Sequence, residues 1–191
     1  MSSQKSRFST TDQEIMLGLA RESIEYGLQK GGVLPVDPEL YEGDLRENGA
    51  CFVTLKRSGQ LRGCIGSISA YQPLIMDVAD KAHGAAFRDP RFPPLRKNEW
   101  PGLDLHISVL TPLQEMQFVS EADLLSKIRP LQDGLVLEDG RYKGTFLPVM
   151  WEQLPTAPEF LAHLKLKAGL TVDHWSPRIR VWRFQAESIK A

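Results

Sequence analysis

Residues 61–66 read Leu61-Arg62-Gly63-Cys64-Ile65-Gly66, and this stretch decides how the chain folds. It places a cysteine between two glycines, directly after an arginine, in a segment that otherwise has the pattern of a β-strand. Glycine weakens a strand and usually marks a bulge or the close approach of a ligand or another backbone. Either something packs tightly against this segment, or something has to reach Cys64.

A β-hairpin is predicted around this stretch. Cys51–Arg57 has the composition of a strand, Ser58-Gly59 that of a tight turn, and Gln60–Ser67 that of the returning strand. The length of the turn decides where the thiols point. A two-residue loop puts Cys51 and Cys64 on the same face of the hairpin, whereas a three-residue loop puts them on opposite faces.

Other segments show either helical periodicity or alternation. Strict alternation of apolar and polar residues predicts a half-buried strand, and Asp-Gly between two β-rich runs predicts a second hairpin. Strands grouped with strands and helices with helices indicate the α+β class. Helices are predicted from a capping box at Thr11-Asp12-Gln13-Glu14 to Gly31-Gly32, over Pro73–Phe87 and over Pro155–Leu170; strands over Leu103–Val109, on both sides of Asp139-Gly140, and over Arg178–Ala186.

Composition limits the classes of function. The chain has 191 residues and a formal net charge of −1, which argues against a broad nucleic-acid surface. Two cysteines are too few for a disulfide framework, and no apolar run approaches the ~20 residues that span a bilayer. The polar start lacks the apolar centre of a signal peptide, so a cytoplasmic location is expected. The sequence lacks the spacing of known metal motifs and of a cofactor-phosphate loop, so we expect neither a metal nor a cofactor.

Several blocks in order resemble the AMMECR family. The hexapeptide at residues 61–66 is similar to the family's signature, and the resemblance extends over about residues 10–188. Further blocks are Ala86–Leu95, Ser108–Thr111, Asp133–Leu135, Gly144–Pro148 and Lys167–Leu170. The resemblance implies an α+β fold with two subdomains around a curved, mostly antiparallel sheet flanked by helices. We therefore expect one AMMECR-like domain over residues 1–191, built as one body or as two intimately packed subdomains.

The resemblance also implies partners. Bacterial and archaeal relatives are called the A protein of the AmmeMemoRadiSam system, beside a Memo-type protein and a radical S-adenosylmethionine (SAM) protein. It carries no established activity. It also leads us to expect an acidic residue where this chain has His106.

Cys64 is the candidate nucleophile or redox thiol, which requires nearby positive charge or a histidine base. Arg62 lies two positions away on the same strand, and His83 or His106 are candidate bases. The alternative is a buried cysteine that packs as a small apolar residue. Gly63 and Gly66 then admit either a ligand or a neighbouring helix.

The loop Arg88–Pro94 is the second candidate, because its prolines make a stiff frame suited to recognition. Arg88 and Arg91 are its candidate binding residues if the loop folds over the hairpin. Asp89 is a further candidate, with capping of the turn as the alternative. Asp104, His106 and Ser108 share one strand face, which is either solvated or the wall of a pocket.

These residues support three hypotheses. The first is an accessory or recognition module that presents the Arg62–Cys64 hairpin and the Arg88–Pro94 loop to a protein partner or a small anionic ligand. The second is an enzyme in which Cys64 reacts and Arg62 or Arg88 stabilises an anionic substrate. The third is RNA or nucleotide binding, with a base stacked on Phe92 or Trp151.

Overall fold

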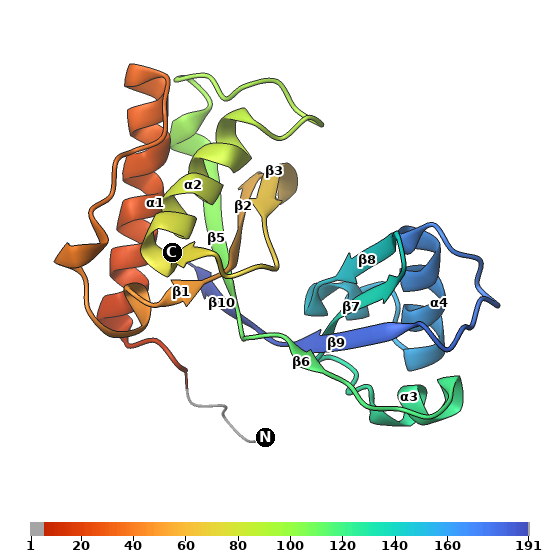
Figure 1. The fold of residues 1–191 in the computed structure, drawn as a ribbon. Coiled ribbons are helices and arrows are strands. Elements are labelled where there is room, and N and C mark those ends of the chain that lie inside the picture. The colour runs from red at the N-terminus through yellow and green to blue at the C-terminus, as the bar shows by residue number, and fades with distance from the viewer. Residues whose placement is uncertain (1–5, 191) are drawn as a thin grey trace. The chain divides into compact units, whose positions relative to one another are not determined.

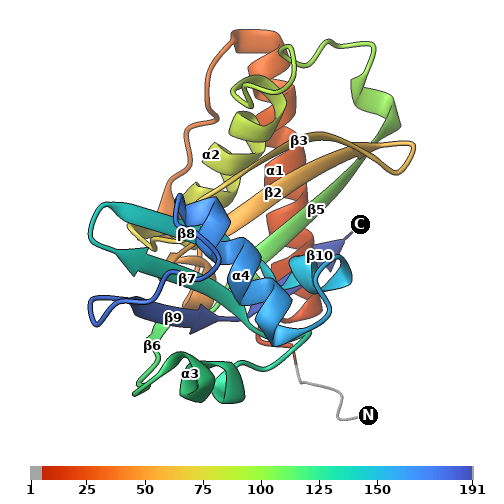
Figure 2. The same ribbon diagram turned by 90° about the vertical axis from the view of Figure 1, so that its right-hand side faces the viewer.

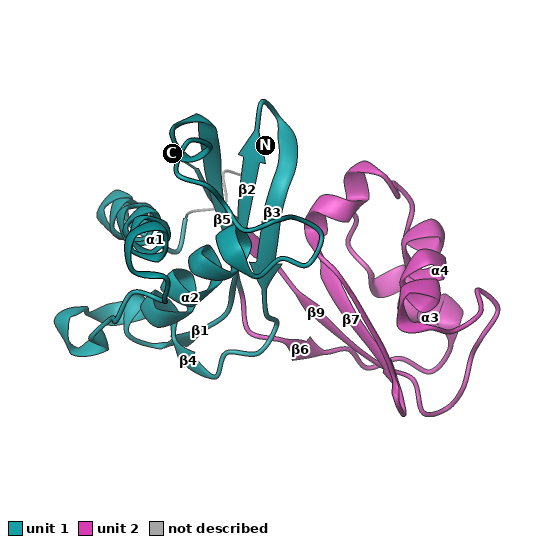
Figure 3. Cartoon of the chain, turned by 90° about the horizontal axis from the view of Figure 1, so that it is seen from above, with its two compact units in different colours: residues 1–110, 187–191 teal, residues 111–186 magenta. Residues whose placement is uncertain are grey.

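A computed structural model describes residues 6–190, and the chain divides into two compact units (Figure 3). Residues 6–110 and 187–190 form unit 1, and residues 111–186 form unit 2. The sheets are antiparallel and helices pack against them, which confirms the α+β class. None of the helices in the described part of the chain is long and apolar enough to cross a membrane.

Unit 1 consists of a four-stranded sheet and two long helices (Figures 1 and 2). The strand order is β10-β5-β2-β3, so β3 lies at one edge of the sheet. Two further strands of two residues each, β1 just before β2 and β4 just after β3 in the sequence, pair with each other in a separate sheet. The bounds are α1 Thr10–Lys30, β1 Asn48–Gly49, β2 Cys51–Arg57, β3 Gln60–Gly66, β4 Gln72–Pro73, α2 Leu74–Phe87, β5 Leu103–Leu110 and β10 Ala186–Lys190, with 3₁₀ turns at Pro38–Leu40, Gly43–Leu45 and Trp100–Gly102.

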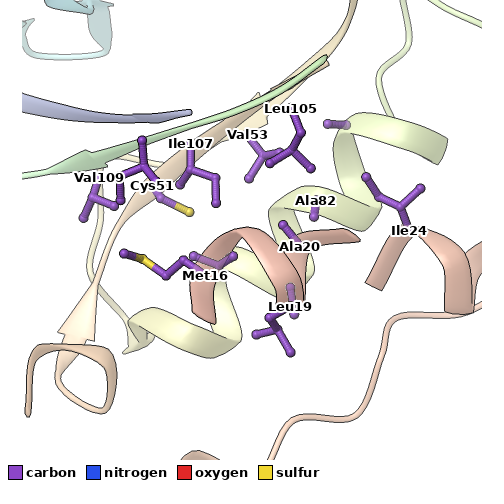
Figure 4. Packing of buried hydrophobic residues seen from close by; sticks show 14 of the residues in the cluster. Met16, Leu19, Ala20, Ile24, Cys51, Val53, Ala82, Leu105, Ile107 and Val109 are labelled. Carbon is purple, nitrogen blue, oxygen red and sulfur yellow. The ribbon is translucent and has the colours of Figure 1, made fainter. Parts of the chain in front are cut away.

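The helix α1 begins slightly earlier than its sequence predicts. Ser9, not Thr11, is the N-cap, and it forms a capping box with Asp12. Gly31 ends the helix in the left-handed conformation, with φ 79°. Both helices bury one side in a core shared with the sheet: Met16 and Ile24 of α1 belong to one buried cluster with Val53 of β2 and Leu105 of β5 (Figure 4).

The hairpin turn forms at Ser58-Gly59, with left-handed φ angles of 50° and 78°. A two-residue loop of this kind matches the twist of the strands that it joins. The ladder then slips by one residue between Leu55 and Lys56, which leaves Arg62 as the extra residue of a β-bulge.

The bulge decides which way Cys64 faces. Beyond it Cys64 pairs with Thr54, so its side chain lies on the face of the sheet away from the helices. Cys51 lies three residues before Thr54, on the opposite face, and is fully buried in the core. The expectation that a two-residue loop puts both thiols on one face is therefore wrong, because it took no account of an extra residue at Arg62.

Unit 2 has a second four-stranded sheet, in the order β6-β9-β7-β8, with α4 packed against β7 and β8. Its core contains Trp151 stacked on Phe160 with ring centroids 4.0 Å apart. The hairpin predicted at Asp139-Gly140 joins β7 to β8. The bounds are β6 Gln114–Glu115, α3 Glu121–Lys127, β7 Gly134–Asp139, β8 Tyr142–Phe146, α4 Ala157–Ala168 and β9 Arg180–Phe184, with a 3₁₀ turn at Pro148–Glu152.

Candidate functional site

The loop after α2 binds the free edge of β3. The backbone N–H of Cys64 donates to Asp89 Oδ2 at 2.8 Å, and Arg91 Nη2 donates to the carbonyl of Cys64 at 3.3 Å. These side chains take the place of a neighbouring strand at the edge of the sheet. The predicted meeting of the 88–94 loop with the hairpin is therefore present, through Asp89 and Arg91.

Asp89 is the centre of this contact. It is 4% exposed and also accepts hydrogen bonds from the backbone N–H, Nε and Nη2 of Arg91. The bond from the Arg91 guanidinium, reinforced by two backbone N–H groups, holds the pKa of Asp89 well below its usual range. A carboxylate with this many donors is a fixed structural anion, so it is already satisfied without a ligand.

Arg62 crosses from the bulge to the far end of the same loop. Its Nε donates to Glu99 at 2.9 Å, and its Nη2 donates to the carbonyl of Pro93 at 3.0 Å. The side chain is buried, and the ion pair lowers the pKa of Glu99 to about 2. Arg62 is thus engaged within the protein, although its buried Nη1 has no hydrogen-bond partner among the described residues.

The two glycines of the hexapeptide are required by packing. A Cβ on Gly63 would lie 2.0 Å from the carbonyl oxygen of Ala85 in α2. A Cβ on Gly66 would lie 2.3 Å from the ring of Phe52, on the other face of the sheet. This geometry matches the alternative that the glycines admit neighbouring protein atoms.

Cys64 is a free, half-buried thiol. Thr54 Oγ1 donates to its Sγ at 3.2 Å, and this is a contact that the sequence alone did not indicate. Thr54 in turn pairs with His106 on β5, so the three side chains form one row across the sheet. Burial, with Lys56 as a lesser cause, lowers the pKa of His106.

His106 is therefore one strand removed from the thiol, with Thr54 between them. Its neighbours Asp104 and Ser108 share its face, as the alternation predicted. On that face Asp104 is exposed, whereas His106 and Ser108 are half-buried, and the face lies opposite the helices.

Two predicted site residues lie elsewhere. His83 is buried, and its ring packs against Phe87 and over Gly27 of α1, which lies on the far side of α2 from β3. Burial lowers its pKa, as for a neutral core histidine. Arg88 donates to the carboxylate and carbonyl of Asp80, eight residues back on α2. Neither residue is brought to Cys64.

The structure also limits the stacking of a nucleic-acid base on Phe92 or Trp151. Trp151 is 1% exposed inside unit 2, so it offers no face to a base. Phe92 is half-buried, and the guanidinium groups of Arg62 and Arg91 already lie 5.8 and 5.6 Å from its ring.

A buried network around Asp77 was missed from the sequence. Asp77 is fully buried, and its carboxylate accepts from the backbone N–H of Cys51 and the amide of Gln72 and pairs with Lys81. Desolvation lowers the pKa of Lys81, but its hydrogen bonds to Asp80 and Tyr71 outweigh this effect, so the pKa is raised above its usual value. The signal was present as acid and lysine four residues apart within an apolar helical stripe. This network ties the start of β2 to α2 and holds the hairpin from behind.

Comparison with known proteins gives the class to which this fold belongs. The sequence profile of the AMMECR1 family matches residues 17–189, and the chain belongs to this family. It is 40% identical over 184 residues to a protein of Methanothermobacter thermautotrophicus, with 94% of each chain covered. It is 38% identical to the protein MJ0810 of Methanocaldococcus jannaschii, with 88% of this chain and 84% of that one covered.

A solved structure supports the same conclusion. The crystal structure of the uncharacterized protein PH0010 from Pyrococcus horikoshii superposes with a TM-score of 0.82 at 35% sequence identity. The match covers 92% of this chain and 89% of that one. The fold is therefore shared across nearly the whole chain.

Proposed function

We propose that this protein is a recognition module that binds an acidic surface of a partner protein. The binding surface consists of the edge of β3 and of residues 88–98, the segment after α2 that contains the Arg88–Pro94 loop and is called the 88–98 loop below. The observation that carries the proposal is the rigid attachment of this loop, through Asp89, Arg91 and Arg62, to the edge of the sheet. A surface that is fixed before binding loses little conformational entropy on association.

The charge of the loop indicates the kind of partner. Residues 88–98 carry four basic side chains and one acidic one, whereas the whole chain has a formal net charge of −1. Arg96 and Lys97 are exposed, and neither side chain contacts a carboxylate within residues 6–190. Unpaired basic groups beside exposed prolines favour an acidic protein surface, because complementary charge guides encounter and fixes register.

The small-anion version of this hypothesis has weaker support. Arg62, Arg88 and Arg91 each pair with an internal carboxylate. A ligand would have to displace these partners, one of which is the buried Asp89. A protein surface can instead use the outer groups without breaking the internal pairs.

The Memo-type and radical SAM proteins of the same organism are the partners to test. Biolayer interferometry with each immobilised partner measures affinity as a function of salt. The double reversal R96E/K97E should lower affinity about tenfold or more at low salt, with most of the change in the association rate. The matched reversal R141E/K143E, on exposed positions of unit 2, should leave it unchanged.

Equal binding by both double variants would disprove the assignment of the 88–98 loop. Absence of binding to either partner by the unaltered protein would disprove the partners named here.

One observation favours an enzyme as the second candidate. Thr54 Oγ1 donates a hydrogen bond to Cys64 Sγ, so a polar group of the neighbouring strand contacts the sulfur that would react. Cys64 also has no disulfide partner. A rapid, single-site reaction with iodoacetamide in the folded protein, abolished in C64S, would support this candidate over the first.

A further inference from the structure

Unit 2 contains a cavity where two strands of its sheet diverge. The strand β6 pairs with β9 at Glu115 and Trp182, and the N–H of Met116 still donates to the carbonyl of Val181 at 2.8 Å. The chain before β9 then turns back on itself, because the N–H of Ile179 donates to the carbonyl of Ser176. A cavity of about 370 Å³ lies between residues 115–119 and residues 175–180.

The inner part of the cavity is apolar. Met116 and Ile179, at 4% and 5% exposure, belong to the core of unit 2 and form its base. The rings of Phe118 and Trp175 lie 5.7 Å apart at 57° to each other. Val119, which is 94% exposed, lies at the open side. The apolar floor of the cavity and these two rings suit an aromatic or long aliphatic side chain of a ligand.

The outer part of the cavity carries one acid and one base. Arg180 Nε donates to Glu115 Oε1 at 2.9 Å, with the two side chains 55% and 39% exposed. The Arg180 guanidinium also lies 4.7 Å from the ring centre of Trp182, which fixes its position. An exposed ion pair contributes little stability, so a ligand that offers both charges can replace it at small cost.

The 174–178 wall is held in place by a buried carboxylate. Asp139 is 2% exposed and accepts hydrogen bonds from His174 Nε2 at 2.6 Å and from Ser176 Oγ at 2.8 Å. Because Ser176 lines the cavity, these bonds fix the wall without any ligand. The cavity is thus formed in advance, as ligand sites usually are.

We propose that this cavity binds a free α-amino acid with a large apolar side chain. The ammonium group pairs with Glu115, the carboxylate pairs with Arg180, and the side chain packs on Met116 and Ile179 beside the rings of Phe118 and Trp175. The cavity is near the lower end of ligand-site volumes, roughly 300 Å³, which suits a single amino acid rather than a larger cofactor. The inference is independent of the proposed function, because residues 60–66 and 88–98 contribute nothing to this cavity.

Calorimetric titration of the full-length protein with L-phenylalanine tests the proposal, with tryptophan fluorescence as a second readout. Three analogues remove one feature each: phenethylamine lacks the carboxylate, 3-phenylpropionate lacks the ammonium group, and glycine lacks the side chain. We expect L-phenylalanine to bind and each analogue to bind about tenfold more weakly or worse, since each loses one charge-assisted or apolar contact.

Variants assign the binding to this cavity. Arg180→Met and Glu115→Gln should each weaken L-phenylalanine binding about tenfold while circular dichroism remains unchanged. The matched controls are Lys143→Met and Glu138→Gln, an ion pair of similar exposure at 3.4 Å that lies outside the cavity. The controls should bind as the unaltered protein does.

Three results would overturn the proposal. The first is no heat and no fluorescence change with about 20 mM L-phenylalanine, because the dissociation constant would then exceed that of any useful affinity. The second is equal binding of L-phenylalanine and its two singly charged analogues, which would indicate an uncharged side-chain slot. The third is unchanged binding in Arg180→Met and Glu115→Gln.

Discussion

Replacing Gly63 with alanine tests the tight packing of β3 against α2. The new Cβ would lie 2.0 Å from the carbonyl oxygen of Ala85, whereas real Cβ contacts are essentially never shorter than 3.0 Å. Both groups belong to backbone, so α2 and β3 must separate by about 1 Å, a case of overpacking in a dense core. Since overpacking costs about 1–3 kcal/mol, we expect the upper end, about 3 kcal/mol.

The control is the same substitution at Gly18. This glycine is exposed in the interior of α1, and a Cβ there would meet nothing within 4 Å. Alanine should therefore stabilise the protein by about 0.5–1 kcal/mol, because glycine is the poorer helix former. The same glycine-to-alanine change is thus expected to lower the stability of the protein at position 63 and to raise it at position 18.

Thermal unfolding followed by far-ultraviolet circular dichroism measures both effects. At about 2–4 °C per kcal/mol for a chain of this size, the midpoint should fall by about 6–12 °C in Gly63→Ala. In Gly18→Ala it should rise by about 1–4 °C. A Gly63→Ala variant that unfolds within about 0.5 kcal/mol of the unaltered protein would show that the described contact is not a real constraint.

Three further predictions concern β3 and the residues that contact it in unit 1. Asp89→Asn should lower the free energy of unfolding at pH 7 by about 3 kcal/mol, since it removes a buried charge from its donors. Because the pKa of Asp89 is depressed in the folded state, the stability that its carboxylate contributes is complete above about pH 4 and is lost as the pH falls below that value. Chemical denaturation should therefore show the unfolding free energies of the unaltered protein and of Asp89→Asn converging as the pH falls. A constant difference between them down to about pH 2 would contradict this. In native-state alkylation followed by mass spectrometry, Cys64 should react and Cys51 should react only on unfolding, with no disulfide between them under oxidation; an internal disulfide would refute the opposite-face assignment. Thr54→Val should change the alkylation rate of Cys64 several-fold because it removes the hydroxyl that contacts the sulfur, and an unchanged rate would show that the hydrogen bond is not maintained in solution.

Local patterns were sufficient for most of the elements. The turn at Ser58-Gly59, the alternation of Leu103–Val109 and the Asp139-Gly140 hairpin each formed where the sequence predicts them. These signals act over a few residues, because turn chemistry and side-chain alternation are properties of the local backbone.

The orientation of Cys64 depended on something that no local pattern contains. The bulge at Arg62 reverses the face of every later residue in the strand. It occurs at the residue whose guanidinium binds Glu99. The sequence separation of 37 residues between the two partners puts this contact beyond any pattern analysis. Strand alternation was therefore correct on each side of the bulge and misleading across it.

The same limit applies to the histidine. Periodicity placed His83 in α2, but it gave no indication that the ring would turn towards α1 instead of β3. The loop prediction was nearer to the structure, since Arg91 does reach Cys64, because prolines restrict where a short loop can go. Which arginine made the contact followed only from the fold.

The chain order of the two units has a consequence for how the protein is made. The strand β10 completes the sheet of unit 1, where Ile189 is fully buried, yet its residues 187–190 are synthesised after all of unit 2. Unit 2 is one continuous segment and has every residue that it needs before β10 exists. Unit 1, although synthesis starts with it, must wait with one side of β5 unpaired. Translation thus fixes an order of maturation in which the unit begun first is finished last.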